Sequence, residues 1–503
     1  MTDLFTNLAL GFQSALTIAN IGYCFVGVLI GTLVGVLPGL GPVATLALLL
    51  PLTYALDPTA AVIMLAGIYY GSQYGGSTTA ILMNIPGEAA SLVTCIDGYK
   101  LARKGRAGSA LGIAAIASFI AGTVATLLIA LASPVLSEVA LYFGATEYFS
   151  LMVLGLVGAV ALSNGDILKA IAMVIVGLLL GLVGTDINTG ELRFTLETLT
   201  LQDGIDFAVI SMGFYGVAEI LKNLQAIVGS SSYSTIAVKS PWPEKKDFTQ
   251  SQGAIARGTF LGSLMGLLPG GGAMLSSFAS YTLEKRIKTE NETPVGEGNI
   301  RAVAGPEAAN NAGAQTSFIP MLTLGIPSNA VMALLMGALI IQNITPGPQV
   351  IHTNPDLFWG LIVSMWIGNL FLVVLNLPLA GLWVQILKVP YRFLFPAILA
   401  ICAVGVYSIN YNNYDIVLMA AFALLGYIFY QLRCEPAPLI LGFVLGPMME
   451  ENLRRAMLLS RGDATVFFTS PISAVLLVLA FALLAVTLLP KWQKTRQEAF
   501  TED

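Results

Sequence analysis

The sequence predicts an all-α polytopic membrane protein made of two inverted-topology repeats, with re-entrant hairpins and broken helices. Three observations lead to this prediction: an apolar composition, a duplicated pair of Pro/Gly motifs, and the distribution of Lys and Arg between loops. Of the 503 residues, 56% are hydrophobic and 11% are charged, and the mean hydropathy is +0.79. Such a chain cannot be wrapped around a soluble core, and its net charge of −5 argues against a nucleic-acid partner.

Long apolar segments account for the predicted membrane spans. Examples lie at residues 111–131, 167–183, 357–377 and 475–489. A helix needs about 20 apolar residues to cross about 30 Å of hydrocarbon, whereas the strands of a membrane β-barrel are short and alternate polar with apolar residues. The start, MTDLFTNLAL, lacks the basic residues and cleavage site of a signal peptide, so we expect the first apolar run to stay in the mature protein. The four cysteines stand singly, without CxxC, as is typical of small buried apolar residues.

Two motifs occur twice in the same order. GTLVGVLPGLGP at 31–42 aligns without gaps with GSLMGLLPGGGA at 262–273, which sets a first offset in numbering (262 − 31 = 231). YGGSTTAILMNIPG at 74–87 corresponds to QTSFIPMLTLGIPS at 315–328, which sets a second offset (315 − 74 = 241). We therefore expect a first repeat at 1–230 and a second at 258–503, joined by a cytoplasmic linker at 231–257.

The basic residues predict that the two repeats are inverted in the membrane, because loops rich in Lys and Arg stay in the cytoplasm. In the first half the basic loop follows the second motif, at 100–106; in the second half it separates the motifs, at 285–301. The predicted cytoplasmic loops lie near 100–106, 164–169, 222–257, 285–301, 388–392 and 433. The predicted outer loops lie near 57, 133–147, 184–205, 342–356 and 409–415. Beyond Arg433 the sequence leaves open three arrangements: the basic residues at 454–461 lie outside, those of the C-terminal tail do, or the segment 436–450 only dips into the membrane.

The length of the second Leu-Pro-Gly region predicts a re-entrant hairpin. Between Arg257 and Lys285, both assigned to the cytoplasm, only the segment 258–284 remains for two helical arms. About 13 residues per arm, at about 1.5 Å each, reach about 20 Å and do not cross the bilayer. The Leu-Pro-Gly motifs are therefore expected to form hairpin tips near the midplane, entering from opposite faces.

Broken helices in corresponding places of inverted repeats indicate the binding site of a secondary transporter. A helix N-terminus offers free N–H groups and partial positive charge to an anion, and helix C-terminal carbonyls can bind a cation. Polar residues also cluster at the second motif of each half. The predicted substrate-binding residues are Pro38, Gly39, Gly41, Ser77, Thr78, Thr79, Asn84, Pro86, Gly87, Pro269, Gly270, Gly271, Gly272, Asn310, Asn311, Gln315, Thr316, Ser317, Pro327 and Ser328.

None of these positions has a charged amine, so a carboxylate would be held by amides, hydroxyls, helix ends and a co-bound cation. A coupling Na⁺ would bind near Gly39, Asn84, Gly270 or Thr323, and no other cofactor is expected. Glu88 and Glu307 flank the site and could serve a cation or a proton, or simply be solvated or capping carboxylates. Taken alone, GxxxG is typical of close helix packing, and membrane-helix hydroxyls often bond their own backbone. The coincidence of two duplicated breaks with polar residues favours the functional interpretation.

The same motifs carry a resemblance to a known family. GVLPGLGP, YGGSTTAILMNIPGEAAS, IDGYKLARKGRAG, GLLPGGGA, GPEAANNAGAQTSFIPMLTLGIPS, NITPGP and PLILGFVLGPMMEENLRRA resemble the large membrane subunit, the TctA-type permease, of the tripartite tricarboxylate transporters. The resemblance implies a multi-pass protein of the bacterial inner membrane that works with a small four-helix membrane subunit and a periplasmic substrate-binding protein. It also implies import of citrate or another small carboxylate, driven by a cation gradient.

The resemblance does not choose among tricarboxylates, dicarboxylates and aromatic acids, or between Na⁺ and H⁺. A passive anion channel is the alternative function, because selectivity filters also use broken helices. An intramembrane enzyme is disfavoured, since the chain has no HExxH, no GxGD and no Ser/His pair. No GxxxxGK[ST] string is present, so ATP is not expected to drive transport directly.

Overall fold

The computed structural model describes residues 2–37, 41–163, 166–186, 189–227, 242–268, 272–287, 293–386 and 391–488. Nearly all regular structure in these ranges is helical, which confirms the predicted all-α class. The strands β1 (Gly184–Thr185) and β2 (Leu192–Arg193) pair antiparallel in a short hairpin. Within the described ranges, five segments are long and apolar enough to cross a membrane: Ile18–Gly35, Ala89–Ala140, Pro355–Asn376, Asn413–Gln431 and Pro471–Leu488.

The helices before residue 228 include both motifs of the first half. They are α1 (Thr2–Ala15), α2 (Ile18–Gly35), α3 (Pro42–Leu49), η1 (Leu50–Thr53), α4 (Pro58–Met83), η2 (Ala89–Ser91), α5 (Leu92–Leu101), η3 (Ala102–Arg106), α6 (Ala107–Ala140), α7 (Ala145–Leu162), α8 (Ile167–Gly181), η4 (Leu199–Leu201), α9 (Phe207–Ser211), η5 (Met212–Val217) and α10 (Ala218–Ile227).

The helices after residue 241 include the second pair of motifs. They are α11 (Lys245–Gly266), α12 (Ala273–Arg286), α13 (Arg301–Thr316), α14 (Phe318–Leu324), α15 (Ala330–Ile341), α16 (Val350–Thr353), α17 (Pro355–Asn376), α18 (Ala380–Ile386), α19 (Tyr391–Asn410), α20 (Asn413–Gln431), α21 (Pro436–Leu459), α22 (Val466–Thr469) and α23 (Pro471–Leu488).

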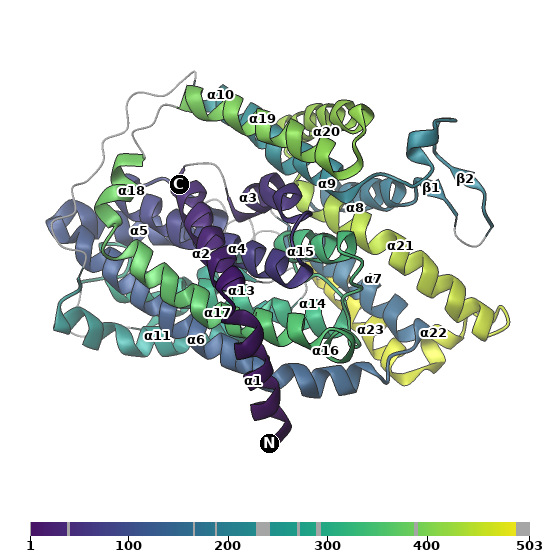
Figure 1. Cartoon of the computed structure of the whole chain (residues 1–503). Helices are drawn as coiled ribbons and strands as arrows, with labels where there is room; N and C mark the ends of the chain where they lie inside the picture. The colour runs from purple at the N-terminus through teal and green to yellow at the C-terminus, as the bar shows by residue number, and fades with distance from the viewer. Residues whose placement is uncertain are drawn as a thin grey trace.

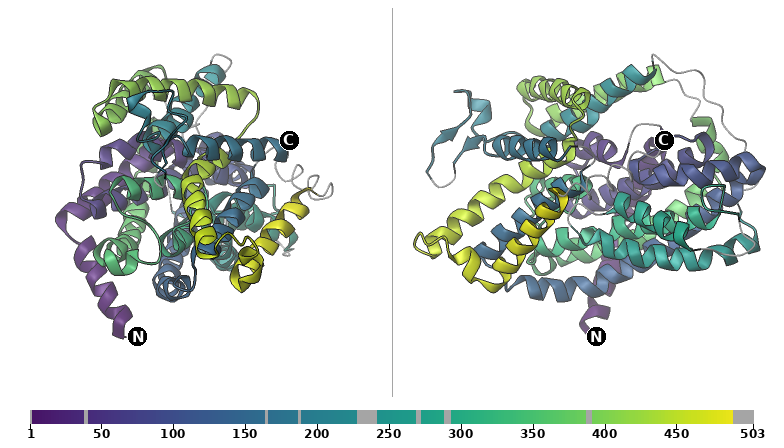
Figure 2. Two further views of the ribbon diagram at one scale, coloured as in Figure 1. Left: turned by 90° about the vertical axis from the view of Figure 1, so that its right-hand side faces the viewer. Right: turned by 180° about the vertical axis from the view of Figure 1, so that it is seen from behind.

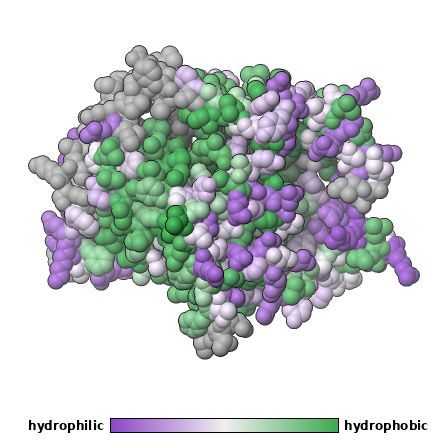
Figure 3. All heavy atoms as spheres, in the orientation of Figure 1, coloured by the Kyte–Doolittle hydropathy of each residue, from purple (hydrophilic) through white to green (hydrophobic). Residues whose placement is uncertain are grey.

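Helices α2, α4, α13 and α17 cross the middle of the molecule (Figure 1). α7, α8, α21 and α23 pack together at one end. α10, α19 and α20 lie together on one side of the molecule, where α20 packs on α10, α19 and η5 (Figure 1 and Figure 2). On the face shown in Figure 3, hydrophobic residues cover much of the left and centre, and hydrophilic residues gather toward the right-hand end. A surface of this kind is expected for a protein with a lipid-facing belt and one end exposed to water.

The helix breaks recur at the offsets found in the sequence. α2 ends at Gly35 and α3 begins at Pro42, while α11 ends at Gly266 and α12 begins at Ala273, so both boundaries repeat at the first offset. α4 ends before Asn84 (φ 59°) and α14 ends before Gly325 (φ 68°); both residues are left-handed, and they are related by the second offset. The motifs aligned in the sequence therefore end and restart helices at equivalent positions.

Glycines pack the helix pairs at the same offsets. A Cβ on Gly31 of α2 would clash with the carbonyl oxygen of Ile68 in α4, and a Cβ on Gly262 of α11 would clash with that of Ala309 in α13. Ile68 and Ala309 are themselves related by the second offset. Small residues let the backbones of neighbouring membrane helices approach closely, so each half contains an equivalent tight helix pair.

The arms around the second break differ in length. α12 has 14 residues, close to the expected arm length, but α11 has 22 residues because it begins at Lys245. The range assigned to the linker, 231–257, therefore contains the first turns of α11. Its earlier part, up to residue 241, lies outside the described residues.

Polar contacts join loops that the sequence places on the same side of the membrane. Lys100 donates to the Gly296 carbonyl (2.5 Å), and Arg106 pairs with Asp247. On the other side, Gln342 donates to the Thr53 carbonyl (3.1 Å). These contacts support the predicted grouping of loops.

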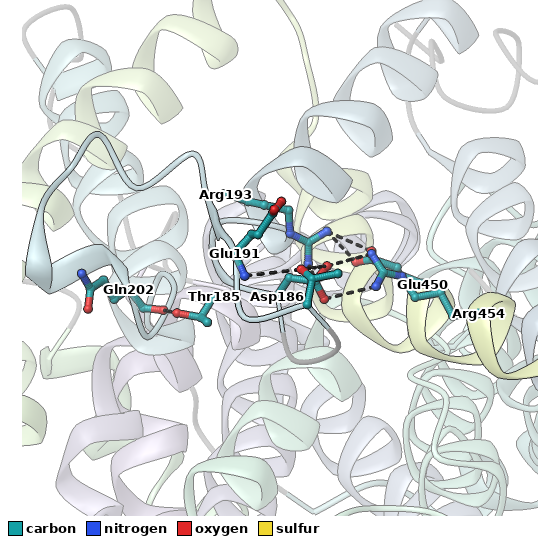
Figure 4. Close-up of polar contacts among 8 residues, drawn as sticks. Thr185, Asp186, Glu191, Arg193, Gln202, Glu450 and Arg454 are labelled. Atoms are coloured by element: carbon teal, nitrogen blue, oxygen red, sulfur yellow. Dashed lines mark hydrogen bonds and ion pairs between the residues drawn. The ribbon is translucent and has the colours of Figure 1, made fainter.

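An ion-pair cluster joins α21 to the hairpin of β1 and β2 (Figure 4). Arg454 of α21 pairs with Asp186 (3.0 Å) and Glu450 (2.6 Å), and Arg193 of β2 pairs with Glu450 (2.9 Å). α21 runs parallel to α8, since Gly177 packs on Leu439 and Gly181 on Phe443. The end of α21 therefore lies beside the loop at 184–205, which the sequence assigns to the outer side.

Candidate functional site

Five helical segments begin at one cavity of about 510 Å³. Its lining includes the first residues, or the residue just before them, of α3, of η2 with the following α5, of α12, of α15 and of α21. These residues are Gly41 to Ala44, Glu88 to Ala90, Ala273 and Met274, Asn329 to Val331, and Glu435 to Pro438. Helix starts from distant parts of the sequence therefore line the same cavity.

This arrangement favours an anion. The first N–H groups of a helix have no partner within the helix, and each N-terminus carries a partial charge of about +0.5. The starts of α3 and α12 are related by the first offset, and Glu88 and Asn329, the residues before η2 and α15, are related by the second. Two pairs of equivalent helix starts therefore face the cavity, and α21 adds a fifth.

Local sequence explains where these helices start. Gly272 precedes α12 with φ 81° and ψ −154°, a conformation that is accessible mainly to glycine. Asn329 caps α15, because its Oδ1 accepts a hydrogen bond from the N–H of Met332 (3.0 Å). Pro42 and Pro436 occupy the first turns of α3 and α21, where a missing N–H costs nothing.

Polar side chains from other helices complete the lining. Tyr69 comes from α4, Ser163 from the end of α7 and Tyr215 from η5. Lys222 of α10 also lines the cavity, where its Nζ lies 2.8 Å from Glu219 and 5.1 Å from the centre of the Tyr430 ring. The cavity thus has an ammonium group, which the sequence-predicted site lacked.

Three of the described residues that were predicted to bind substrate line the cavity: Gly41, Pro86 and Gly87. Gly272 lies directly before the lining residue Ala273. The predicted tip residues Pro38, Gly39, Pro269, Gly270 and Gly271 lie outside the described residues.

Two of the predicted polar residues, Ser77 and Asn310, belong to a buried network behind the cavity. Asn310 of α13 donates to Glu88 (3.1 Å) and accepts from Gln73 (3.3 Å). Ser77 and Thr94 donate to Glu307 at 2.8 and 2.6 Å. This network connects α4, α5 and α13 directly to the wall of the site.

The remaining predicted amides bond elsewhere in the core. Asn311 donates to Ser118 (2.7 Å), and Gln315 accepts from Thr126 (2.6 Å). Both amides reach toward α6, and neither Asn311 nor Gln315 lines the cavity.

The hydroxyls mostly satisfy backbone carbonyls. Thr79 donates to Val36 (2.7 Å), at the end of α2, and thereby ties α4 to the first break. The other bonds run from Thr78 to Tyr74, Thr316 to Ala312, Ser317 to Gly313, Thr323 to Ile319 and Ser328 to Ser317. Pro327 is buried and Asn84 is exposed, and neither lines the cavity.

Sequence reasoning missed Asn329, Lys222 and Glu435 as lining residues. Asn329 could have been found, because it is the counterpart of Glu88 at the second offset. The string EPAP at 435–438 contains the proline signal of a helix start. Lys222 gave no such signal, since a lysine near a membrane edge first indicates a cytoplasmic loop.

Comparisons with known proteins agree with this picture. Residues 21–441 match the Tripartite tricarboxylate transporter TctA family. An "Uncharacterized 52.8 kDa protein in TAR-I ttuC' 3'region" of Agrobacterium vitis is 58% identical over 506 aligned positions, covering all of both chains. An "Uncharacterized protein in TAR-II ttuC' 3'region" of the same organism is 59% identical over 242 residues, covering 48% of this chain and all of the relative. No solved structure matches the chain.

Proposed function

Because the chain belongs to the tripartite tricarboxylate transporter TctA family, we propose that it imports small carboxylates by secondary active transport and binds them in the cavity where five helical segments begin. The family makes the chain a membrane transport subunit and not an enzyme. The proposal adds the site, the direction and the energy source.

The convergence of helix starts is the observation that carries the proposal. Multivalent carboxylates need several donors at once, and the first residues of α3, α12 and α15, whose N–H groups include ones without a partner inside the helix, line one cavity. Lys222 adds an ammonium group at the wall, where it is paired with Glu219. A cavity of about 510 Å³ is within the usual size range of small-molecule sites.

We extend the proposal to the architecture. The two halves are inverted copies, and their Pro/Gly breaks are re-entrant tips near the bilayer midplane. The matching breaks and the matching glycine contacts support a duplicated unit. The opposite orientation of the two halves in the membrane is inferred from the placement of the basic loops.

The proposed partners follow from the family. They are a small four-helix membrane subunit and a periplasmic substrate-binding protein, with the whole system in a bacterial inner membrane. The proposed driving force is symport with Na⁺ or H⁺, with Na⁺ near the breaks at Gly39, Asn84, Gly270 or Thr323.

Uptake into proteoliposomes tests the proposal. Vesicles contain this chain with its small subunit, and the binding protein is added outside or omitted. Labelled citrate, several dicarboxylates and an aromatic acid are offered with a Na⁺ gradient, a proton gradient or none. We expect saturable uptake that requires a gradient and the binding protein.

The same assay separates the alternative function. A passive anion channel would give flux that neither saturates nor concentrates the anion, whatever the gradient. That result would contradict the proposal, and the helix starts would then form a selectivity filter.

A further inference from the structure

We propose that Glu88 binds the coupling cation, H⁺ or Na⁺, and that the carboxylate substrate binds beside it only when Glu88 is neutralised. The inference rests on the proposed function. It makes Glu88 the residue that couples binding of the cation to binding of the carboxylate.

Glu88 stands at the wall of the cavity with little access to anything else. The residue is 8% exposed and lines the cavity. Asn310 donates to its Oε1 at 3.1 Å, and a Cβ on Gly41, before α3, would lie 4.0 Å from its Cβ. Within the ranges that the structure describes, no Lys or Arg forms an ion pair with Glu88.

The other half of the molecule has a neutral residue in the equivalent place. Asn329 is the counterpart of Glu88, and Gly272 is the counterpart of Gly41. A Cβ on Gly272 would lie 2.7 Å from the Asn329 amide nitrogen, so Asn329 sits against Gly272 as Glu88 sits near Gly41. The fold therefore accepts an uncharged side chain, Asn329, at this position in the second half. The carboxylate of Glu88 at the same position of the first half is not needed for the fold alone.

An ionised Glu88 opposes the function of the cavity. Helix starts and Lys222 attract an anion, whereas a nearly buried carboxylate repels it, and the repulsion is weakly screened away from water. A cation on Glu88 removes the repulsion, so binding of the cation raises the affinity for the anion. By linkage the bound anion raises the affinity for the cation equally.

Two other carboxylates near Glu88 already have partners of their own. Glu219 is paired with Lys222 (2.8 Å), and Glu307 accepts hydrogen bonds from Ser77 and Thr94 behind the wall. The titratable groups that line the cavity are Tyr69 of α4, Tyr215 of η5, Glu219 and Lys222 of α10, and Glu435 before α21. The helices packed against η2 add Tyr70 and Tyr74 of α4, Cys95, Asp97 (held by the 296–299 backbone), Tyr99 and Lys100 of α5, Tyr281, Glu284 (paired with Arg257), Lys285 and Arg286 of α12, and Arg301 and Glu307 of α13.

The test compares wild type with Glu88→Gln, which keeps the shape and removes the charge. Binding of labelled citrate and of the dicarboxylate panel to the purified full chain is measured against pH at fixed Na⁺ and against Na⁺ at fixed pH. Gradient-driven accumulation and exchange of internal for external anion are measured in proteoliposomes. Glu138→Gln, which makes the same change at an exposed carboxylate of α6 that does not line the cavity, is the matched control.

We expect wild-type affinity to fall as pH rises if H⁺ is the cation, or to rise with Na⁺ if Na⁺ is. Glu88→Gln should lose that dependence and lose accumulation, but keep binding and exchange, because its neutral amide imitates the neutralised state. Glu138→Gln should keep wild-type binding, ion dependence and accumulation. Glu88→Gln that still accumulates anion with wild-type ion dependence overturns the inference.

A second measurement needs no variant and covers the case in which Glu88→Gln does not fold. Carbodiimide attacks protonated carboxyls in apolar surroundings, and mass spectrometry locates the adduct. We expect modification of Glu88 that raised pH suppresses, and that Na⁺ also suppresses if Na⁺ is the cation; an unmodified Glu88, or modification indifferent to both pH and Na⁺, contradicts the inference. Wild type that binds none of the anions contradicts the proposed function instead, so the two failures are distinguishable.

Discussion

Arg454 of α21 holds Asp186, far earlier in the chain, with two hydrogen bonds of 3.0 and 3.2 Å. This pair joins the far end of α21 to the hairpin of β1 and β2. Together with the parallel packing of α8 and α21, it places Arg454 and Arg455 at the hairpin end of the molecule. Arg454 is paired there with Asp186 and Glu450, and Arg455 with Glu451.

The first prediction concerns the sidedness of this region. In a background without native cysteines, Ala464→Cys should react with a membrane-impermeant maleimide in right-side-out vesicles, and Arg103→Cys only in inverted ones. Both positions are exposed. Labelling of both cysteines from the same side would contradict the assignment of α21's end to the outer face.

The second prediction concerns the tight pair of α2 and α4. A Cβ on Gly35 would overlap the carbonyl of Ser72, whereas a Cβ on Gly22 of the same helix meets nothing within 4 Å. Gly35→Ala should cost about 1–3 kcal/mol of stability through overpacking. Gly22→Ala should be neutral or stabilise by up to about 1 kcal/mol, since alanine favours helix.

Thermal unfolding in detergent, followed by size-exclusion chromatography of the heated samples, measures both variants. If Gly35→Ala and Gly22→Ala unfold at the same temperature, the backbones of α2 and α4 can move apart without loss of stability, which contradicts the prediction.

The third prediction contrasts two equivalent glycines at the cavity. Gly272 has φ 81° and lies against Asn329, whereas Gly41 has φ −74° and a Cβ there would meet only Glu88, at 4.0 Å. Gly272→Ala should strain the backbone by about 1–3 kcal/mol and abolish carboxylate binding. Gly41→Ala should fold and bind as wild type does.

Binding of labelled citrate and the dicarboxylate panel to purified protein is the measurement for this pair. Full binding by Gly272→Ala would mean that the start of α12 does not shape the site.

The fourth prediction concerns Lys222. Lys222→Met should weaken carboxylate binding about tenfold or more, as expected for a lost charge-assisted hydrogen bond, and Lys222→Arg should retain most of it. The double variant Lys222→Met/Glu219→Gln removes the ion pair without leaving Glu219 unpaired. If the double variant regains wild-type affinity, Lys222 acts only by neutralising Glu219 and does not attract the anion.

The helix breaks could be predicted because Pro and Gly mark them locally. The Leu-Pro-Gly strings end α2 at Gly35 and α11 at Gly266, and neither depends on distant residues. The apolar runs likewise predicted helices such as α17 and α23, because a span must be apolar along about 20 residues.

The lining of the cavity was only partly predictable. The start of α21 lies at the cavity because α21 packs against α7 and α8. No local sequence pattern predicts this packing. Ser77 and Asn311 lie in fully buried helices, where a polar residue satisfied by another helix has the same sequence signal as one that faces a ligand. Separating the two cases requires the three-dimensional arrangement.

Helix α6, Ala107–Ala140, has 34 residues and is therefore about 51 Å long. A hydrocarbon core of about 30 Å cannot contain it unless the helix tilts strongly or projects from the bilayer. Its last turns, after Pro134, expose Val135 and Val139, which suits a position among lipid headgroups. Bilayer thickness then acts on this helix directly: a thicker membrane would draw these turns into the hydrocarbon, and a thinner one would tip α6 toward the membrane plane.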